Sequence, residues 1–342
     1  SEGVSPMTHE MRWLGSTGVK VSPLCLGTMT FGSKWPFVAT TTQEQANEIV
    51  ARCLDAGINF FDTADVYHDG ESETILGRAL GERRKEVIVA TKVRGRMGPG
   101  ANQVGLSRHH ILNSVDASLE RLGTDYIDLY QVHCWDEQTP LEETLRALDD
   151  LVRWGKVRYV GASNFAAWQL MKALDLADGQ GWTRFASLQP LYNVLQRDLE
   201  LELVPLCLDQ KLAILPWSPL AGSFLSGKYR RGQARPQGSR RTNPENQFLQ
   251  FDEERGFDVI EELSRIAAAQ GGTVAQAALN WLLAKPGVTS VVIGARDLRQ
   301  LEDNLGCLRW TMTANEVARL DALSPPPRLY PRWFIDIQHQ NR

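Results

Sequence analysis

The feature that most constrains the fold is an alternation of short apolar runs with helical segments, which recurs eight times along the 342-residue chain. The apolar runs are continuous, and this is typical of parallel strands covered on both faces. Strands are expected within residues 24–32, 58–67, 86–93, 126–133, 157–164, 185–193, 212–220 and 290–295.

The segments between these runs have apolar residues at helical spacing. Helix 107–123 begins at a serine N-cap, helix 140–155 has a proline near its start, and Gly57 is the expected C-cap of helix 42–57. Helix 201–210 is weaker because Pro205 interrupts it. Further helices are expected within 72–84, 166–177, 258–270, 273–285, 298–306 and 315–323.

Two α/β architectures fit this pattern, a closed (β/α)8 TIM barrel and an open doubly wound sheet. Eight near-equal units without a midpoint favour the barrel. The first strand is also not followed by G-x-G-x-x-G, the phosphate-binding sequence of the open dinucleotide fold. We therefore predict a TIM barrel with an N-terminal β-hairpin around residues 15–18 and a long loop, 219–250, after the seventh strand.

The expected organisation is an N-terminal tail (1–10), a single barrel domain (11–323) and an irregular C-terminal tail (324–342). We interpret the stretch before Met7 as an expression remnant in part. No basic region followed by an apolar stretch opens the chain, so no signal peptide is expected.

Composition narrows the class of protein. The net charge of -4 gives no reason to expect nucleic acid or an anionic membrane as partner, and no apolar run approaches the ~20 residues that span a bilayer. The five cysteines include no C-x-x-C, which argues against a disulfide framework and against a zinc site. We expect a cytoplasmic protein without a metal.

Polar residues follow consecutive strands, at the barrel end where chemistry takes place. Asp62 and Tyr67 follow the second strand, Lys92 ends the third and His133 the fourth. A lysine cation lowers the pKa of a neighbouring tyrosine, Asp62 can pair with that lysine, and His133 can bind a substrate oxygen. The group predicts a general acid that protonates an oxygen gaining electron density, as when hydride reaches a carbonyl carbon. Because no side chain donates hydride, a nicotinamide cofactor is implied.

Each of these residues taken alone has a structural explanation, such as a solvated lysine or a capping acid. Their position at consecutive strand ends is what favours a shared pocket. We interpret His109 and His110, at a helix start, as surface residues. Asp65 is assigned no catalytic role and at most braces its loop.

Polar groups at the later strand ends suit the cofactor. Ser163, Asn164 and Gln189 offer hydroxyl and amide groups for a carboxamide, and Trp217 offers a flat face for ring stacking. Arg296 follows the eighth strand, where barrels commonly bind phosphate, and suits a 2′-phosphate.

The chain resembles the aldo-keto reductase family from about residue 11 to residue 323. The motifs are GTMTFG (27–32), FFDTADVY (60–67), ATK (90–92), YQVH (130–133), GASN (161–164), LQPLYN (188–193), PWSPLAGSFLSGKY (216–229), IGAR (293–296) and EDN (302–304). The resemblance implies a (β/α)8 barrel that uses NADPH/NADP+ without a Rossmann fold, and a catalytic tetrad of Asp62, Tyr67, Lys92 and His133.

The resemblance also implies the cofactor contacts. They are Thr28, Met29, Asp62, Ser163, Asn164, Gln189, Trp217, Ser218, Pro219, Leu220, Ala221, Gly222, Lys228, Gly294, Arg296, Gln300 and Asn304, with Ser239 and Arg240 in the long loop. Trp217 and the Gly294-Ala295-Arg296 sequence are similar to the bacterial and potassium-channel β-subunit branches. Related branches include monomers and oligomers, so the oligomeric state stays open.

The favoured hypothesis is an NADP(H)-dependent alcohol oxidoreductase that reduces aldehydes or ketones, with Tyr67 as general acid. One alternative is an NADPH-binding, redox-sensing regulatory subunit with little turnover. Another is an aldolase-like barrel in which Lys92 forms a Schiff base. Trp35 and Trp135, with Phe37 and Trp333, are expected to wall the pocket for a small-molecule carbonyl substrate.

Overall fold

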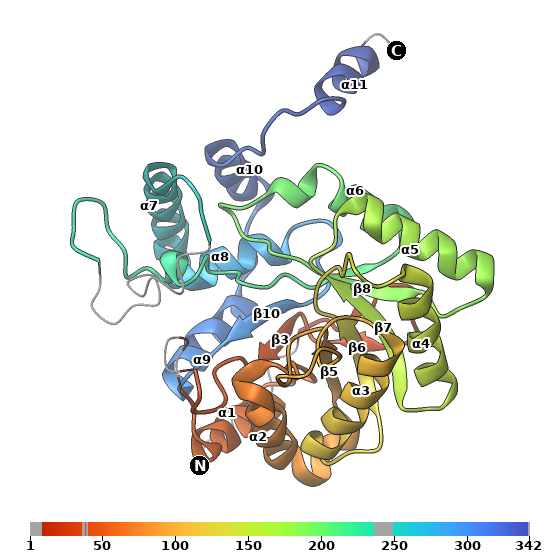
Figure 1. Cartoon of the computed structure of the whole chain (residues 1–342). Helices are drawn as coiled ribbons and strands as arrows, with labels where there is room; N and C mark the ends of the chain where they lie inside the picture. The colour runs from red at the N-terminus through yellow and green to blue at the C-terminus, as the bar shows by residue number, and fades with distance from the viewer. Residues whose placement is uncertain (1–8, 36–37, 39, 236–248, 341–342) are drawn as a thin grey trace.

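The structure is a computed structural model that describes residues 9–35, 38, 40–235 and 249–340. Eight parallel strands form one sheet in the order β10-β3-β4-β5-β6-β7-β8-β9 (Figure 1). They are β3 (Leu24–Gly27), β4 (Phe60–Asp62), β5 (Ile88–Val93), β6 (Ile127–Val132), β7 (Val157–Ser163), β8 (Phe185–Gln189), β9 (Ala213–Ile214) and β10 (Val291–Gly294). All eight predicted strands are therefore present.

Hydrogen bonds between the two edges of this sheet close the barrel. The amide of Val292 in β10 donates to the carbonyl of Pro216, just after β9, over 2.9 Å. Just before β10, the amide of Thr289 donates to the carbonyl of Ile214, also over 2.9 Å. The closed architecture predicted from the repeat is confirmed, and an open sheet is excluded.

The helices surround the strands (Figure 1). Ser107 caps one of them by accepting from the amide of His110, as expected. Pro205 lies in the first turn of its helix. Amides in the first turn have no acceptor within the helix, so the proline, which lacks an amide hydrogen, breaks no helical hydrogen bond there. The bounds are α1 (Gln43–Asp55), α2 (Glu71–Leu80), α3 (Arg108–Leu122), α4 (Leu141–Arg153), α5 (Ala167–Gln180), α6 (Leu203–Gln210), α7 (Glu253–Ala269), α8 (Val274–Leu283), α9 (Leu298–Leu305), α10 (Ala314–Leu323) and α11 (Arg332–His339).

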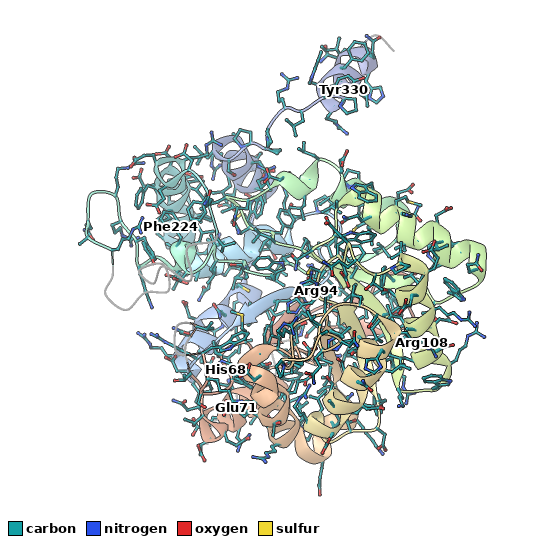
Figure 2. The ribbon with its side chains drawn as sticks, viewed as in Figure 1. His68, Glu71, Arg94, Arg108, Phe224 and Tyr330 are labelled. Carbon is teal, nitrogen blue, oxygen red and sulfur yellow. The ribbon has the colours of Figure 1, made fainter. Side chains whose placement is uncertain are left out.

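The expectation of an irregular C-terminal tail is wrong, because α11 lies within it. Pro331 precedes the first turn, and an Arg332–Asp336 ion pair of 3.1 Å joins residues four apart on the helix. The helix lies beyond α10 (Figure 1) and borders a hollow that α6 also lines, and Tyr330 precedes it (Figure 2). That residues 11–323 form one domain stays a prediction.

The predicted N-terminal hairpin closes the amino end of the barrel. Strands β1 (Arg12–Trp13) and β2 (Lys20–Val21) pair antiparallel. Gly15 at the turn has a φ of +59°, and a Cβ there would lie 2.4 Å from the carbonyl oxygen of Ala186. This turn therefore packs directly against the barrel wall, and only glycine fits it without strain.

The barrel interior consists of an apolar layer with a polar layer above it. Two apolar side chains of the hairpin, five of the strands and one directly after β9 form the lower layer: Leu14, Val21, Cys25, Phe60, Ala90, Leu129, Ala213 and Leu215. Successive side chains of a strand alternate between its two faces. Residues two positions further along β4, β5 and β6 therefore also point inward, and these are Asp62, Lys92 and Gln131.

The close approach of α2 to α3 yields a first prediction. A Cβ at Gly77 would lie 2.3 Å from the carbonyl oxygen of Leu122, whereas a Cβ at Gly179 in α5 would meet nothing within 4 Å. Gly77→Ala should destabilise the fold by roughly 1–3 kcal/mol, because the two helices must separate. Gly179→Ala should be neutral or stabilise by up to about 1 kcal/mol. Thermal denaturation of the two variants checks this, and equal midpoints would contradict the close contact.

Candidate active site

Three of the four predicted catalytic side chains meet at the carboxyl end of the barrel. Asp62 ends β4, Lys92 lies in β5, and Tyr67 begins the 3-10 turn Tyr67–Gly70 after β4. The Nζ atom of Lys92 lies 2.5 Å from Oδ2 of Asp62, 2.8 Å from the carbonyl oxygen of Thr63 and 3.4 Å from the hydroxyl of Tyr67. The lysine thus links the acid to the tyrosine.

His133, directly after β6, completes the group from the other side of the tyrosine. Its ring packs edge-on against the ring of Tyr67, with centroids 5.9 Å apart and an interplanar angle of 79°. The amide of His133 donates to the carbonyl of Val93 over 2.9 Å, which fixes the chain beside β5. The structure therefore brings all four sequence-predicted residues together.

Burial controls the protonation of Lys92 and Tyr67. Burial, the largest single influence, would lower the pKa of Lys92, but the charges and hydrogen bonds of Asp62 and Tyr67 together outweigh it, and the pKa lies above its ordinary value. Burial raises the pKa of Tyr67 above its ordinary value, although Lys92 acts in the opposite direction. The expected net lowering of the tyrosine pKa is therefore not found, and Tyr67 carries its proton at neutral pH.

His133 is neutral in this site. Burial, followed by the positive charges of Lys92 and Arg94, lowers the pKa of His133 to about 3. Arg94 lies near the strand ends in the middle of the barrel (Figure 2). A neutral imidazole offers one N–H donor at any pH above about 4.

The geometry disfavours Lys92 as a Schiff-base nucleophile. A nucleophilic amine must be uncharged, but Lys92 is paired with Asp62 and its pKa is raised. Its Nζ atom also donates to Asp62, to the carbonyl of Thr63 and to Tyr67. The arrangement suits a fixed cation.

Four predicted cofactor residues form one hydrogen-bonded network at the ends of β7, β8 and β9. The Ser163 hydroxyl donates to the carbonyl of Gln189 over 2.7 Å, and the Asn164 amide donates to the Ser163 hydroxyl over 3.1 Å. The indole N–H of Trp217 donates to Oδ1 of Asn164 over 3.1 Å. Asn164 has a φ of +54°, an uncommon value that places its side chain at this position. The network orients several donors and one flat ring around a shared space.

The stretch after β9 that contains the predicted cofactor contacts Ser218 to Gly222 has a strained backbone. Ser218, Ala221 and Ser223 have φ values of +51°, +48° and +75°. Non-glycine residues in this conformation are rare, and they cluster at ligand-binding sites. The Ser218 hydroxyl accepts from the amide of Gly222 over 3.2 Å, which holds the turn. Pro219 is buried and Leu220 is half-buried in the same stretch.

The segment after β10 presents Arg296 at the start of α9. The amide of Arg296 donates to the side-chain oxygen of Gln300 over 3.2 Å, and Asn304 donates to the carbonyl of Gly294 over 3.1 Å. These two bonds tie the loop to α9. The Arg296 side chain is exposed, with Asp297 3.8 Å away.

The remaining predicted cofactor residues differ in accessibility. The Thr28 hydroxyl is buried and bonded to the hydroxyl of Ser72 in α2 over 2.8 Å. The carbonyl of Met29 is engaged by Nε2 of His68 over 3.1 Å, and Lys228 is exposed. Ser239, Arg240 and the aromatic residue Phe37 lie outside the described residues.

The two predicted substrate residues lie in different surroundings. The Trp35 ring packs edge-on against Tyr67 at 6.1 Å and stacks on His68 at 5.4 Å. Trp135 packs against Phe165 at 5.3 Å and against Trp168. Only Trp35 is thus recorded against a predicted catalytic side chain among the described residues. The tail residue Trp333 lines a separate hollow of about 420 Å³ beside α6.

Gln131 belongs to the site although it was not among the predicted residues, and His110 differs from its predicted surface position. Gln131 donates to Oδ1 of Asp62 over 3.0 Å. Gln131 lies two residues before His133, so strand alternation predicts that its side chain points into the barrel. It was overlooked because it lies within an otherwise apolar run. His110 is buried rather than exposed, and Nε2 lies 3.3 Å from the carbonyl oxygen of Gly95. This contact between a helix and a distant loop leaves no local pattern in the sequence.

Asp65 is buried, and no side chain among the described residues donates a hydrogen bond to its carboxyl oxygens. Burial, and then the nearby carboxylate of Glu73, raise the pKa of Asp65 to about 8, against the backbone amide of Val66 and the charges of Arg121 and Lys92. The side chain is therefore mostly a neutral acid at pH 7. Its amide donates to the carbonyl of Lys92 over 3.3 Å, so the residue joins its loop to β5.

This protonation yields a second prediction. Because the folded pKa of about 8 exceeds the ordinary 3.8, the stability linked to Asp65 is full below about pH 4 and declines as pH rises toward 8. The limiting slope is about 1.4 kcal/mol per pH unit. Asp65→Asn removes this slope, so it should gain thermal stability relative to wild type between pH 4 and 8. Asp69→Asn, an exposed change in the same turn, should follow wild type. A wild-type slope in Asp65→Asn would refute the assignment.

The fold and the polar cluster at its strand ends define an enzyme of the (β/α)8 barrel class. A sequence model described as the Aldo/keto reductase family matches residues 23–325, and the chain belongs to that family. It is accordingly an oxidoreductase of a family that acts on small-molecule carbonyl compounds. Among the described residues, no helix has both the length and the apolar character to cross a membrane.

Curated relatives match over most of their length. The versiconal hemiacetal acetate reductase of Aspergillus parasiticus is 35% identical, with 93% of this chain and 98% of the relative covered. A protein described as the uncharacterized oxidoreductase YrpG of Bacillus subtilis is 37% identical, with 93% and 97% covered. A protein described as a probable voltage-gated potassium channel subunit beta of Arabidopsis thaliana is 38% identical, with 85% and 89% covered.

Proposed function

We propose that this chain is an NADPH-dependent carbonyl reductase that converts an aldehyde or ketone into the corresponding alcohol. The observation that carries the proposal is the position of Lys92, whose Nζ atom contacts both the carboxylate of Asp62 and the hydroxyl of Tyr67. That contact places a protonated tyrosine beside a fixed cation at the end of the barrel where such enzymes react.

Tyr67 is the proton donor in this proposal. As charge develops on the carbonyl oxygen of the substrate, Tyr67 gives that oxygen its hydroxyl proton and later regains a proton from water. The Lys92 cation stabilises the transient phenolate, which makes the transfer easier. His133, neutral and packed against Tyr67, donates a hydrogen bond that orients the same oxygen.

The cofactor supplies the hydride that the carbonyl carbon accepts. Ser163, Asn164 and Gln189 would offer hydroxyl and amide groups to its carboxamide, and Trp217 a flat face to its ring. The side chains of Ser163, Asn164 and Trp217 and the backbone carbonyl of Gln189 already form one network. The left-handed turn that includes Ser218 and Ala221 would hold the pyrophosphate through its backbone.

Arg296 accounts for the choice of NADPH over NADH in the proposal. Its exposed guanidinium follows β10 and suits a 2′-phosphate through bidentate hydrogen bonds. Trp35, beside Tyr67, would form one wall for the substrate, with an apolar or aromatic carbonyl compound as the expected class. The cytoplasmic location stays a prediction.

Tyr67→Phe provides the third prediction. Removal of the hydroxyl deletes the proton donor but keeps the ring, so turnover of 4-nitrobenzaldehyde should fall by roughly 10²–10⁴-fold while NADPH still binds. Loss of NADPH absorbance measures turnover, and quenching of protein fluorescence measures binding. Equal, negligible turnover in wild type and variant would contradict the proposal. Tight NADPH binding together with a stable protein partner would then favour a regulatory subunit.

Arg296→Ala provides the fourth prediction. Loss of a charge-assisted hydrogen bond worth about 1.5–3 kcal/mol should raise the Kd for NADPH roughly 10- to 100-fold and leave the Kd for NADH nearly unchanged. Arg299→Ala is the matched control, because Arg299 is also an exposed arginine and lies three positions further along. Fluorescence titration with both nucleotides checks the effect, and parallel weakening of both would refute a 2′-phosphate contact.

A further inference from the structure

The carboxylate of Asp62 accepts hydrogen bonds from three buried side chains on three strands. Oδ2 accepts from Lys92 in β5 over 2.5 Å. Oδ1 accepts from the amide of Gln131 in β6 over 3.0 Å and from the amide of Gln189 in β8 over 2.8 Å. Two amides on one oxygen fix the rotation of the carboxylate, which a single lysine contact leaves free.

Gln131 is an unfavourable residue for folding alone. It is fully buried, and its Oε1 atom has no hydrogen-bond partner among the described residues. Reversing the amide would set Oε1 against a carboxylate oxygen, so the N–H group must face Asp62. A buried polar atom without a partner costs roughly 1–3 kcal/mol, which an apolar side chain of equal size avoids.

Neighbouring strands leave Gln131 little freedom to move. Gln131, Gly161 and Ser187 are in register across β6, β7 and β8. A Cβ at Gly161 would lie 2.5 Å from Oγ of Ser187 and 3.3 Å from Cγ of Gln131, so both side chains pack over the bare glycine. The position holds the amide of Gln131 against Asp62.

Gln189 differs from Gln131 because it lies at the carboxyl end of β8, next to the predicted nicotinamide site. Its carbonyl accepts from Ser163, which belongs to the same network. In the proposed function the Gln189 amide also serves the cofactor carboxamide, so Gln131 is the amide donor that serves Oδ1 of Asp62 alone.

We propose that Gln131 is a positioning residue that holds Asp62 against Lys92 while Gln189 binds the cofactor. The inference rests on the proposed function, because it assigns Gln189 to the nicotinamide. Four charged or titratable groups surround Gln131 and Asp62: Lys92 in β5, Tyr67 on its turn, His133 after β6 and the thiol of Cys25 in β3. Burial and the charge of Asp62 hold the pKa of the Cys25 thiol well above its ordinary value. Gln131 thereby acts on the proton donor through Asp62 and Lys92.

Gln131→Met tests this role, because methionine has a similar volume and no donor. The expected result is a decrease in kcat of roughly 10- to 100-fold, since a displaced carboxylate shifts Lys92 beneath Tyr67. The Kd for NADPH should stay within about 2-fold and thermal stability should be equal or higher, because the unpaired oxygen is gone. Wild-type kcat, or a loss of kcat that accompanies a loss of stability, would overturn the inference.

Gln131→Glu adds a readout that a purely structural residue would not affect. Two carboxyl groups in contact share one proton, so the introduced carboxyl group, when protonated, donates to Asp62. At acidic pH, the ratio of the Gln131→Glu kcat to the wild-type kcat should approach one. It should also exceed the corresponding ratio for Gln131→Met. A ratio that equals the Gln131→Met ratio at every pH would overturn the inference.

Ser290→Ala is the matched control. Ser290 is also fully buried, its hydroxyl has no hydrogen-bond partner among the described residues, and it precedes β10 at the amino end of the barrel, so kcat should not change. Crystal structures of wild type and Gln131→Met separate this inference from the proposed function. A carboxylate that stays 2.5 Å from Lys92 in the variant overturns the positioning role even if turnover is absent altogether.

Discussion

The ion pair between Lys92 and Asp62 is the interaction on which the site depends. Each buried charge costs several kcal/mol in lost hydration, and such a pair persists only when further hydrogen bonds satisfy its remaining atoms. The carbonyl of Thr63 and the amides of Gln131 and Gln189 provide those bonds. The ion pair and its hydrogen-bond partners come from β4, β5, β6 and β8. Strands so far apart in the sheet can meet around one carboxylate only if the sheet curls into a closed barrel.

The apolar layer below this pair strengthens it. Phe60, Ala90 and Leu129 lie one inward position before Asp62, Lys92 and Gln131, and the N-terminal hairpin covers the layer from beneath. Water is kept from the lower side, so the field of Lys92 acts on Tyr67 with little screening. The same burial keeps Tyr67 protonated and His133 neutral, and both states are those that a proton donor and an orienting group require.

The site residues at the strand ends could be predicted from the sequence because two simple rules determine where they lie. Alternation along a strand selects the inward residues, and parallel strands in a barrel all end on the same rim. Asp62, Lys92 and His133 follow from these rules. Gln131 obeys the same alternation, yet it lies inside an apparently apolar run. The pKa of Tyr67 and the burial of His110 depend on packing from distant segments, which no local pattern encodes.

Asp62 and Asp65 show how far such packing decides chemistry. They lie three residues apart in one motif, and both are buried. Asp62 points into the barrel, where a cation and two amide donors satisfy its charge. Asp65 has no side-chain donor to its carboxyl oxygens among the described residues. It is also close enough to the carboxylate of Glu73 to be affected by its charge, so the neutral acid is the stable form. The functional difference between two identical side chains therefore comes from the donors that the closed barrel brings to one of them.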